Sequence, residues 1–149
     1  MMSGEKAPDG IDFRLRHTML PVTDLERSLD FYRRLLGMKI MRRRVNEAKN
    51  VTVGYVGYGD EGSNHALELI QDRGAASDAG VGGWDGHIAI AVSDLYRLSD
   101  VLEKEGVRFD KPAGPVAPGR NDLVAFIRDP DGYEIELTQR QSDADAKPT

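Results

Sequence analysis

Two histidines and two glutamates recur at matching places in the sequence, and their side chains suit metal chemistry. His17 begins the segment HTMLPVTDL, and His87 begins the similar segment HIAIAVSDL 70 residues later. Glu68 and Glu136 lie in the apolar segments ALELI and YEIEL, 68 residues apart. Imidazole nitrogens and carboxylate oxygens together suit Zn, Ni, Co or Fe. Four such donors, with positions left open on the ion, predict a catalytic metal site.

Each of these residues also has a simpler interpretation. A lone histidine at the start of a strand is usually a satisfied polar residue, and a glutamate near a strand end usually faces solvent. The repetition favours the metal site, because independent surface residues need not recur in equivalent places. His65 provides the contrast, since it lies beside a Gly-Ser-Asn segment and has no counterpart in the second half. We therefore predict that His65 is a surface residue.

The elements that must position these residues also occur twice. Alternating apolar residues and turn signals predict a strand, a helix and three strands, and then the same order again. The sequence DPDG at 129–132 predicts a tight turn. The predicted strands are 13–22, 38–45, 51–59 and 65–71 in the first half, and 86–92, 107–112, 123–129 and 133–139 in the second.

Capping signals bound the two predicted helices. Thr23 is the predicted N-cap of the first helix, with Glu26 three residues later completing a capping box. Ser93 is the predicted cap of the second helix. Gly37 and Gly106 follow the last apolar residues of the two helices and suit the C′ position. Both helices should therefore be short and should end at a glycine.

The repeated order indicates an internal duplication and an α+β fold of two tandem βαβββ modules. We expect the modules to form a curved, cup-like mixed sheet, with His17, His87, Glu68 and Glu136 converging in the cup. The predicted organisation is a flexible leader, two modules joined by a Gly- and Ala-rich linker, and a polar tail. Their bounds are 1–12 for the leader, 13–73 for module one, 74–85 for the linker, 86–140 for module two and 141–149 for the tail.

Composition excludes several classes of function. The chain has 149 residues, enough for one compact domain or two small modules that share a core. Its formal charge of −5 argues against nucleic acid or an anionic membrane as the main partner. The absence of cysteine excludes disulfides, thiolate ligands and a cysteine nucleophile. With no apolar leader and no apolar run of about 20 residues, we expect a soluble, cytoplasmic protein.

Several segments together resemble the glyoxalase I (lactoylglutathione lyase) family of the vicinal oxygen chelate superfamily, in its short bacterial form. The resemblance extends from about Leu15 to Leu137 and includes the order and spacing of the motifs. It rests on HTMLPVTDLERSLDFYRRLLGMK, VGYG, LEL, GHIAIAV, AGPV and AFIRDPDGYEIEL.

The resemblance implies a metal bound by His17, Glu68, His87 and Glu136, with nickel or cobalt preferred to zinc. It also implies a homodimer in which His17 and Glu68 of one subunit meet His87 and Glu136 of the other. The implied reaction isomerises the hemithioacetal of methylglyoxal and glutathione, or a related thiol, to a lactoyl thioester. Glu136 would be the catalytic base and Glu68 would hold the metal or assist on the other face. No redox cofactor is implied.

Three positions depart from the family pattern for glutathione contacts. Pro21 replaces an arginine, Asp72 an asparagine and Ala117 a lysine. Loss of a charge-assisted contact to a carboxylate costs roughly 1.5–3 kcal/mol. A different thiol or a different substrate is therefore as compatible with the sequence as rearranged glutathione contacts. The candidate replacement cations are Arg42, Arg43, Arg44, Arg73 and Arg120.

Rival functions come from within the same superfamily and from a different class. A methylmalonyl-CoA-type epimerase would share the proton abstraction and differ in its substrate pocket. Glu68 argues against a ring-cleaving dioxygenase, because it would fill a position that oxygen needs, and against a fosfomycin-type thiol transferase. A metal-free binding protein of the bleomycin-resistance type would not need four intact ligands.

Overall fold

The computed structural model describes residues 6–74, 81 and 84–141 of the chain. The predicted leader, linker and tail lie partly outside these residues. The elements of module one are β1 (His17–Pro21), α1 (Leu25–Asp30), the π-helical turn η1 (Phe31–Leu35), β2 (Lys39–Asn46), β3 (Val51–Gly57) and β4 (Ala66–Asp72). Those of module two are β5 (His87–Ala91), α2 (Leu95–Lys104), β6 (Phe109–Pro115), β7 (Leu123–Arg128) and β8 (Glu134–Gln139).

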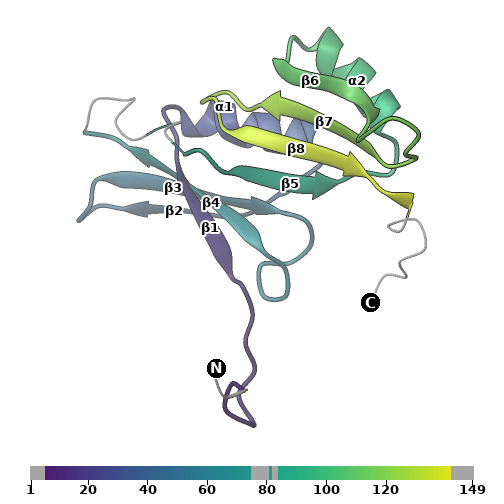
Figure 1. Cartoon of the computed structure of the whole chain (residues 1–149). Coiled ribbons are helices and arrows are strands. Elements are labelled where there is room, and N and C mark those ends of the chain that lie inside the picture. Colours follow the sequence, from purple (N-terminus) through teal and green to yellow (C-terminus); the bar gives the residue numbers. More distant parts are fainter. Residues whose placement is uncertain (1–5, 75–80, 82–83, 142–149) are drawn as a thin grey trace.

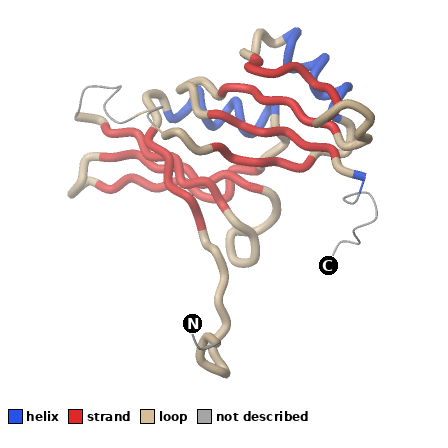
Figure 2. Tube along the Cα trace, in the orientation of Figure 1, coloured by secondary structure: helices blue, strands red, loops and turns tan. Residues whose placement is uncertain are grey.

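The described strands form two four-stranded sheets with the same topology (Figures 1 and 2). The orders are β1-β4-β3-β2 and β5-β8-β7-β6. In each sheet the first strand of the module lies at the edge and runs parallel to the last, while the other neighbours are antiparallel. The predicted α+β fold of two βαβββ modules is confirmed.

One hydrophobic core contains side chains from both modules. Leu67 and Leu69 of β4 contribute from module one, and Ile135 and Leu137 of β8 contribute from module two. These residues alternate with Glu68 and Glu136, and side chains two residues apart share one face of a strand. The apolar residues therefore fix which face of each sheet is buried in this core, and the two glutamates take the opposite face.

The helix ends differ from the predicted caps by one residue in both modules. Asp24 caps α1 by accepting from the Arg27 N–H at 3.1 Å. Asp94 caps α2 in the same way. The prediction of Thr23 and Ser93 as caps was wrong, as was the capping box, because each is followed by an aspartate that caps at least as well. Gly37 and Gly106 have φ values of 69° and 77°, which confirms the predicted C′ positions.

Glu26 and Thr23 make tertiary contacts in place of the capping box. The Glu26 carboxylate pairs with Arg43 of β2. The Thr23 hydroxyl donates to Asp131 in the predicted 129–132 turn, which the structure confirms through a bond from the Gly132 N–H to the Asp129 carbonyl at 3.0 Å. The turn therefore also joins the two modules.

A buried hydrogen bond forms a second junction between the modules. The Tyr32 hydroxyl donates to Asp129 Oδ2 at 2.6 Å, and the backbone N–H groups of Asp131 and Tyr133 donate to Asp129 Oδ1. Burial raises the pKa of Asp129 above its ordinary value, although these hydrogen bonds oppose the shift. The Tyr133 hydroxyl donates in turn to the Pro21 carbonyl at the end of β1. These bonds fix the orientation of one module on the other.

In the part of the chain that the structure describes, no helix is long and apolar enough to cross a membrane.

Candidate metal centre

The first pair of predicted ligands lies on neighbouring parallel strands of one sheet. His17 of β1 is in register with Ala66 of β4, and Glu68 follows two residues later on the same face. His17 Nε2 lies 3.7 Å from Glu68 Oε1. The Glu68 side chain is 10 % exposed and the His17 side chain 35 %. This arrangement, which we call half-site one, places one imidazole and one buried carboxylate together.

The second pair repeats the arrangement in the other sheet. His87 of β5 is in register with Glu134 of β8, and Glu136 follows two residues later. His87 Nε2 lies 3.3 Å from Glu136 Oε2. The Glu136 side chain is 18 % exposed and the His87 side chain 44 %. We call this pair half-site two.

The spacing of the donor atoms in each half-site fits a shared metal ion. Two ligand atoms bound at about 2.1 Å to one ion lie about 3–3.5 Å apart, depending on the coordination angle. The nitrogen–oxygen distances of 3.7 Å and 3.3 Å are close to that spacing. Nitrogen and carboxylate oxygen also belong to the donor set of zinc, nickel and cobalt. Each half-site is therefore suited to supply two ligands to such an ion.

The structure brings the four residues together as two pairs. Among the residues described, no group of three or more His, Asp or Glu side chains is placed to hold one metal ion. The expected convergence of all four ligands within one chain is therefore not present. The core lies between the modules, on the faces of the sheets opposite to the half-sites. Within the described residues, each half-site therefore offers two donors.

Two neighbours of half-site one were not predicted from the sequence. Tyr55 of β3 is in register with Glu68, and its hydroxyl donates to Glu68 Oε2. The Arg44 Nε donates to the Tyr55 hydroxyl at 3.2 Å, and Arg44 Nη2 lies 3.7 Å from Glu68 Oε2. The sequence signal was present, since Tyr55 and Phe126 occupy equivalent positions in the two repeats.

Half-site two has its own unpredicted neighbours. Phe126 of β7 is in register with Glu136 and presents no hydroxyl. Glu134 Oε1 lies 3.9 Å from His87 Nδ1, which is beyond hydrogen-bond distance but places a carboxylate on the side of the ring away from Glu136. Arg128 pairs with Glu134 at 3.1 Å. An acidic group beside the second ring nitrogen is typical of metal-binding histidines.

His65 is exposed and belongs to neither pair, as predicted. Its Nε2 lies 2.9 Å from the Thr18 hydroxyl oxygen, and its Nδ1 lies 3.3 Å from the Leu15 carbonyl oxygen. Both nitrogens are thus used in local structure at the start of β1.

Most of the candidate replacement cations already have partners. Arg42 pairs with Glu61 and Arg73 pairs with Glu47, both on the surface. Arg43 takes Glu26. Arg42 also lies over the Tyr55 ring, but of the two arginines Arg44 reaches the ligand itself, with Nη2 3.7 Å from Glu68 Oε2. Arg44 is therefore the cation best placed to meet an anionic substrate group near the ligands.

The departures from the family pattern lie at strand ends and in a loop. Pro21 and Asp72 are the last residues of β1 and β4. Asp72 Oδ1 accepts from the Gly74 N–H at 2.9 Å. Ala117 is exposed in the loop between β6 and β7. Pro21 and Asp72 therefore lie beyond His17 and Glu68 on the same strands, and none of the three positions is part of the donor set.

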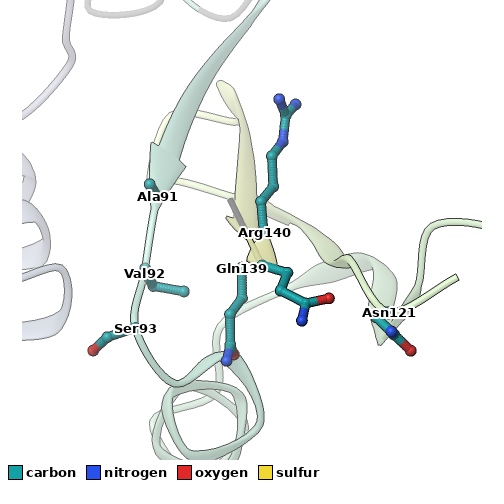
Figure 3. Close-up of a pocket in the computed structure, with 7 residues that line it drawn as sticks. Ala91, Val92, Ser93, Asn121, Gln139 and Arg140 are labelled. Carbon is teal, nitrogen blue, oxygen red and sulfur yellow. The ribbon is translucent and has the colours of Figure 1, made fainter. Parts of the chain in front are cut away.

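A separate pocket of about 540 Å³ lies at the ends of β5 and β8 and contains none of the four predicted ligands (Figure 3). The Arg140 and Gln139 side chains point in different directions there. Its lining residues are Ala91, Val92, Ser93, Asn121, Gln139, Arg140 and Gln141.

The segment before β1 extends away from the body of the molecule (Figure 1). Its alternate residues Ile11, Phe13 and Leu15 are 56 %, 71 % and 82 % exposed, and Met19 of β1 is 49 % exposed. Together with His17 they occupy every second position of the chain. Exposed apolar side chains that gather in one place commonly mark a binding surface.

The chain is similar to known proteins in sequence and in fold. The sequence profile of the Glyoxalase/Bleomycin resistance protein/Dioxygenase superfamily matches residues 14–137. A lactoylglutathione lyase of Neisseria meningitidis is 41% identical over 133 residues, which cover 89% of this chain and 95% of that protein.

Two solved structures have the same fold. Glyoxalase I of Leishmania major, described as trypanothione-dependent, has a TM-score of 0.76 and 36% identity, over 90% of this chain and 91% of that one. Glyoxalase I of Zea mays has a TM-score of 0.76 and 35% identity, over 85% of this chain and 44% of the maize chain. The present chain thus spans less than half of the maize protein. The predicted family resemblance is confirmed, and the chain belongs to the Glyoxalase/Bleomycin resistance protein/Dioxygenase superfamily.

Proposed function

We propose that this protein is a metal-dependent lactoylglutathione lyase that isomerises the hemithioacetal of methylglyoxal and a thiol to the lactoyl thioester, and so detoxifies 2-oxoaldehydes. The observation that carries the proposal is the matched geometry of the two half-sites, each with one imidazole and one carboxylate at metal-ligand spacing. The relatives named lactoylglutathione lyase support it.

The metal in this proposal is a divalent ion, nickel or cobalt in preference to zinc, bound by His17, Glu68, His87 and Glu136. Its chemical contribution is to polarise the two adjacent substrate oxygens and so make the C–H group between oxygen and sulfur more acidic. The donor set supports a divalent metal, and the preference among metals is inferred from the short family form alone.

The proton transfer belongs to Glu136. Its carboxylate removes the hydrogen from the thiol-bearing carbon and returns it to the neighbouring carbonyl carbon. The hydroxyl proton of the first carbon passes to the oxygen of the second, so no electrons leave the substrate. Glu68 is buried and hydrogen-bonded, which supports a ligand role for it. No redox cofactor takes part.

The complete site in this proposal forms between two copies of the chain, in a homodimer with two sites. The separation of the ligands into two pairs supports it, because one chain presents no larger donor group in its described part. The exposed side chains of Ile11, Phe13, Leu15 and Met19 beside His17 support it further, since a partner would cover them. The composition is compatible with a cytoplasmic enzyme.

The thiol is glutathione or a related thiol. Pro21, Asp72 and Ala117 remove contacts that the family pattern gives to glutathione, and Arg44 offers a cation at half-site one. The Leishmania major relative is itself described as trypanothione-dependent, so a change of thiol has a parallel at 36% identity. We propose that Arg44 contacts a carboxylate of the bound thiol.

Thioester formation tests the proposal directly. The protein is loaded with nickel and mixed with methylglyoxal and glutathione, and thioester absorbance is followed, with metal-stripped protein as the control. We expect formation that depends on the metal. If nickel is bound but neither glutathione nor other thiols give thioester, the proposal is wrong. Formation with another thiol alone would retain the reaction and assign the departures to thiol specificity.

A further inference from the structure

Tyr55 and Phe126 are structural equivalents that differ by one hydroxyl group. Tyr55 is in register with Glu68, and Phe126 is in register with Glu136. Each ring also meets the histidine of its half-site edge-on, with centroid distances of 5.8 Å to His17 and 6.0 Å to His87. The two glutamates therefore face rings in the same position, and only Glu68 faces a ring that can donate a hydrogen bond.

The two carboxylate oxygens of Glu68 have different partners, because the Tyr55 hydroxyl binds one of them. It donates to Oε2, while Oε1 faces His17 Nε2 at 3.7 Å. Tyr55 is 3 % exposed and packs with Val53 and Ala66, so its ring has little freedom. Arg44 donates to the hydroxyl oxygen at 3.2 Å, and the Arg42 guanidinium lies over the ring, 4.1 Å from its centroid. The donor to Oε2 is thus itself held from two sides.

Half-site two lacks this support. In the part of the chain that the structure describes, the Glu136 carboxylate has its ion pair with His87 and no hydrogen-bond donor opposite it. The Glu136 side chain is also more exposed than that of Glu68, at 18 % against 10 %. The duplicated frame thus gives the Glu68 carboxylate a hydrogen-bond donor that the Glu136 carboxylate lacks.

We propose that Tyr55 is a positioning residue that restricts Glu68 to metal binding through Oε1, and that its absence opposite Glu136 leaves that glutamate free to transfer protons. This inference rests on the proposed function for the role of Glu136. Hydrogen bonds to ligating carboxylates orient them, and their loss commonly weakens metal binding or activity about 10- to 100-fold. The hydroxyl at position 55 thereby assigns different roles to two otherwise equivalent glutamates.

The test exchanges the hydroxyl between the two half-sites. Tyr55→Phe gives half-site one the ring of half-site two, and Phe126→Tyr does the reverse. Tyr58→Phe is the matched control, because the Tyr58 hydroxyl donates to the Leu36 carbonyl away from both half-sites. The readouts are nickel affinity by chelator competition, the visible spectrum of the cobalt-substituted protein, and kcat and KM at saturating metal.

We expect Tyr55→Phe to weaken metal binding by about 10-fold and to change the cobalt spectrum, with a smaller effect on kcat. We expect Phe126→Tyr to keep the metal affinity and to lower kcat by about 10-fold, because the new hydroxyl holds the base. Tyr58→Phe should change neither. Metal affinity and a cobalt spectrum of Tyr55→Phe that match those of Tyr58→Phe would overturn the inference.

Metal binding separates this inference from the proposed function. A wild-type protein that binds nickel but forms no thioester would contradict the function, while the affinity and spectrum of Tyr55→Phe would still test the role of Tyr55. Arg44→Met offers a second variant that keeps the Tyr55 hydroxyl and removes its supporting donor. We expect a loss of metal affinity smaller than that of Tyr55→Phe, and a larger loss would move the positioning role from Tyr55 to Arg44.

Discussion

Half-site one and half-site two have the same backbone arrangement but different surroundings. In both, an edge strand carries the histidine and its parallel neighbour carries the glutamate two residues beyond the paired position. The surroundings of Glu68 are polar and tightly bonded, whereas Glu136 faces an aromatic ring without a hydroxyl. The two repeats thus share the positions of the histidine and glutamate, and they differ in the side chains that contact the glutamate.

The largest expected effect comes from two variants, one that lacks a ligand of half-site one and one that lacks a ligand of half-site two. Homodimers of His17→Ala and of Glu136→Gln should both be inactive. When the two variants are mixed and allowed to exchange subunits, the mixed dimer keeps one intact half-site one and one intact half-site two, which face each other. About a quarter of the wild-type activity should therefore return.

Subunit exchange is confirmed by mass spectrometry or by differently tagged chains. A site built within one chain would give no recovery, because each chain of the mixed dimer carries a lesion. Recovery would show that the two half-sites act across the interface.

Single substitutions of the two glutamates test whether Glu68 and Glu136 have different roles. Glu136→Gln should lower kcat by about 10²–10⁴-fold while metal remains bound, because the amide cannot accept the proton. Glu68→Gln should weaken metal affinity more than Glu136→Gln does, because it replaces the carboxylate that the structure holds in place. Metal content and kcat are measured on the same preparations. Equal effects of both substitutions on both quantities would contradict the division of roles.

The two rings should also differ in their contribution to stability. Tyr55 is buried against Val53 and Ala66, whereas Phe126 is partly exposed. Truncation of a buried aromatic residue costs about 3–5 kcal/mol, and truncation of a partly exposed one costs less. Tyr55→Ala should therefore lower the free energy of unfolding more than Phe126→Ala, which denaturant titration of the metal-free protein measures. The opposite order would mean that half-site two is the better-packed face.

The smallest expected effect concerns the junction that holds the modules together. Burial raises the pKa of Asp129, so its carboxyl group contributes stability below the unfolded pKa of about 3.9, and this contribution is lost as pH rises through the folded value. Asp129→Asn lacks this dependence. The stability of the variant relative to wild type should therefore increase as pH rises from below about 3.9 through the raised folded pKa of Asp129. A difference that stays constant with pH would exclude Asp129 as the titrating group.

The residue pattern predicted the duplication and the α+β fold, while the pairing of His17 with Glu68 and of His87 with Glu136 was implied by the family resemblance. Repetition and alternation carry this information, because they reflect which face of a strand is buried. Two kinds of feature were missed. The first is the choice of N-cap, because Asp24 and Asp94 each follow a residue, Thr23 or Ser93, that could also cap the helix. In the first helix the Thr23 hydroxyl bonds to Asp131 instead, and Asp24 accepts from the helix N–H group of Arg27.

The second feature that the residue pattern alone missed is the separation of the two pairs of ligands within the chain, which only the family resemblance implied. Repetition shows that two half-sites exist but not which faces of the two sheets are buried against each other. Here the apolar faces form one core, so the ligand faces are turned outward from it. Tyr55 was missed for a related reason, since its role depends on strand register between β3 and β4.

The two ligands of each pair lie on neighbouring parallel strands, β1 with β4 and β5 with β8. Each ligand pair therefore depends on these strands being neighbours in the sheet and not on their order along the chain. Within each sheet, two adjacent strands alone hold the two ligands. A circularly permuted gene, or one that encodes the modules in the reverse order, would keep both ligand pairs as long as these strand neighbours remain. Each module thus carries a complete ligand pair of its own.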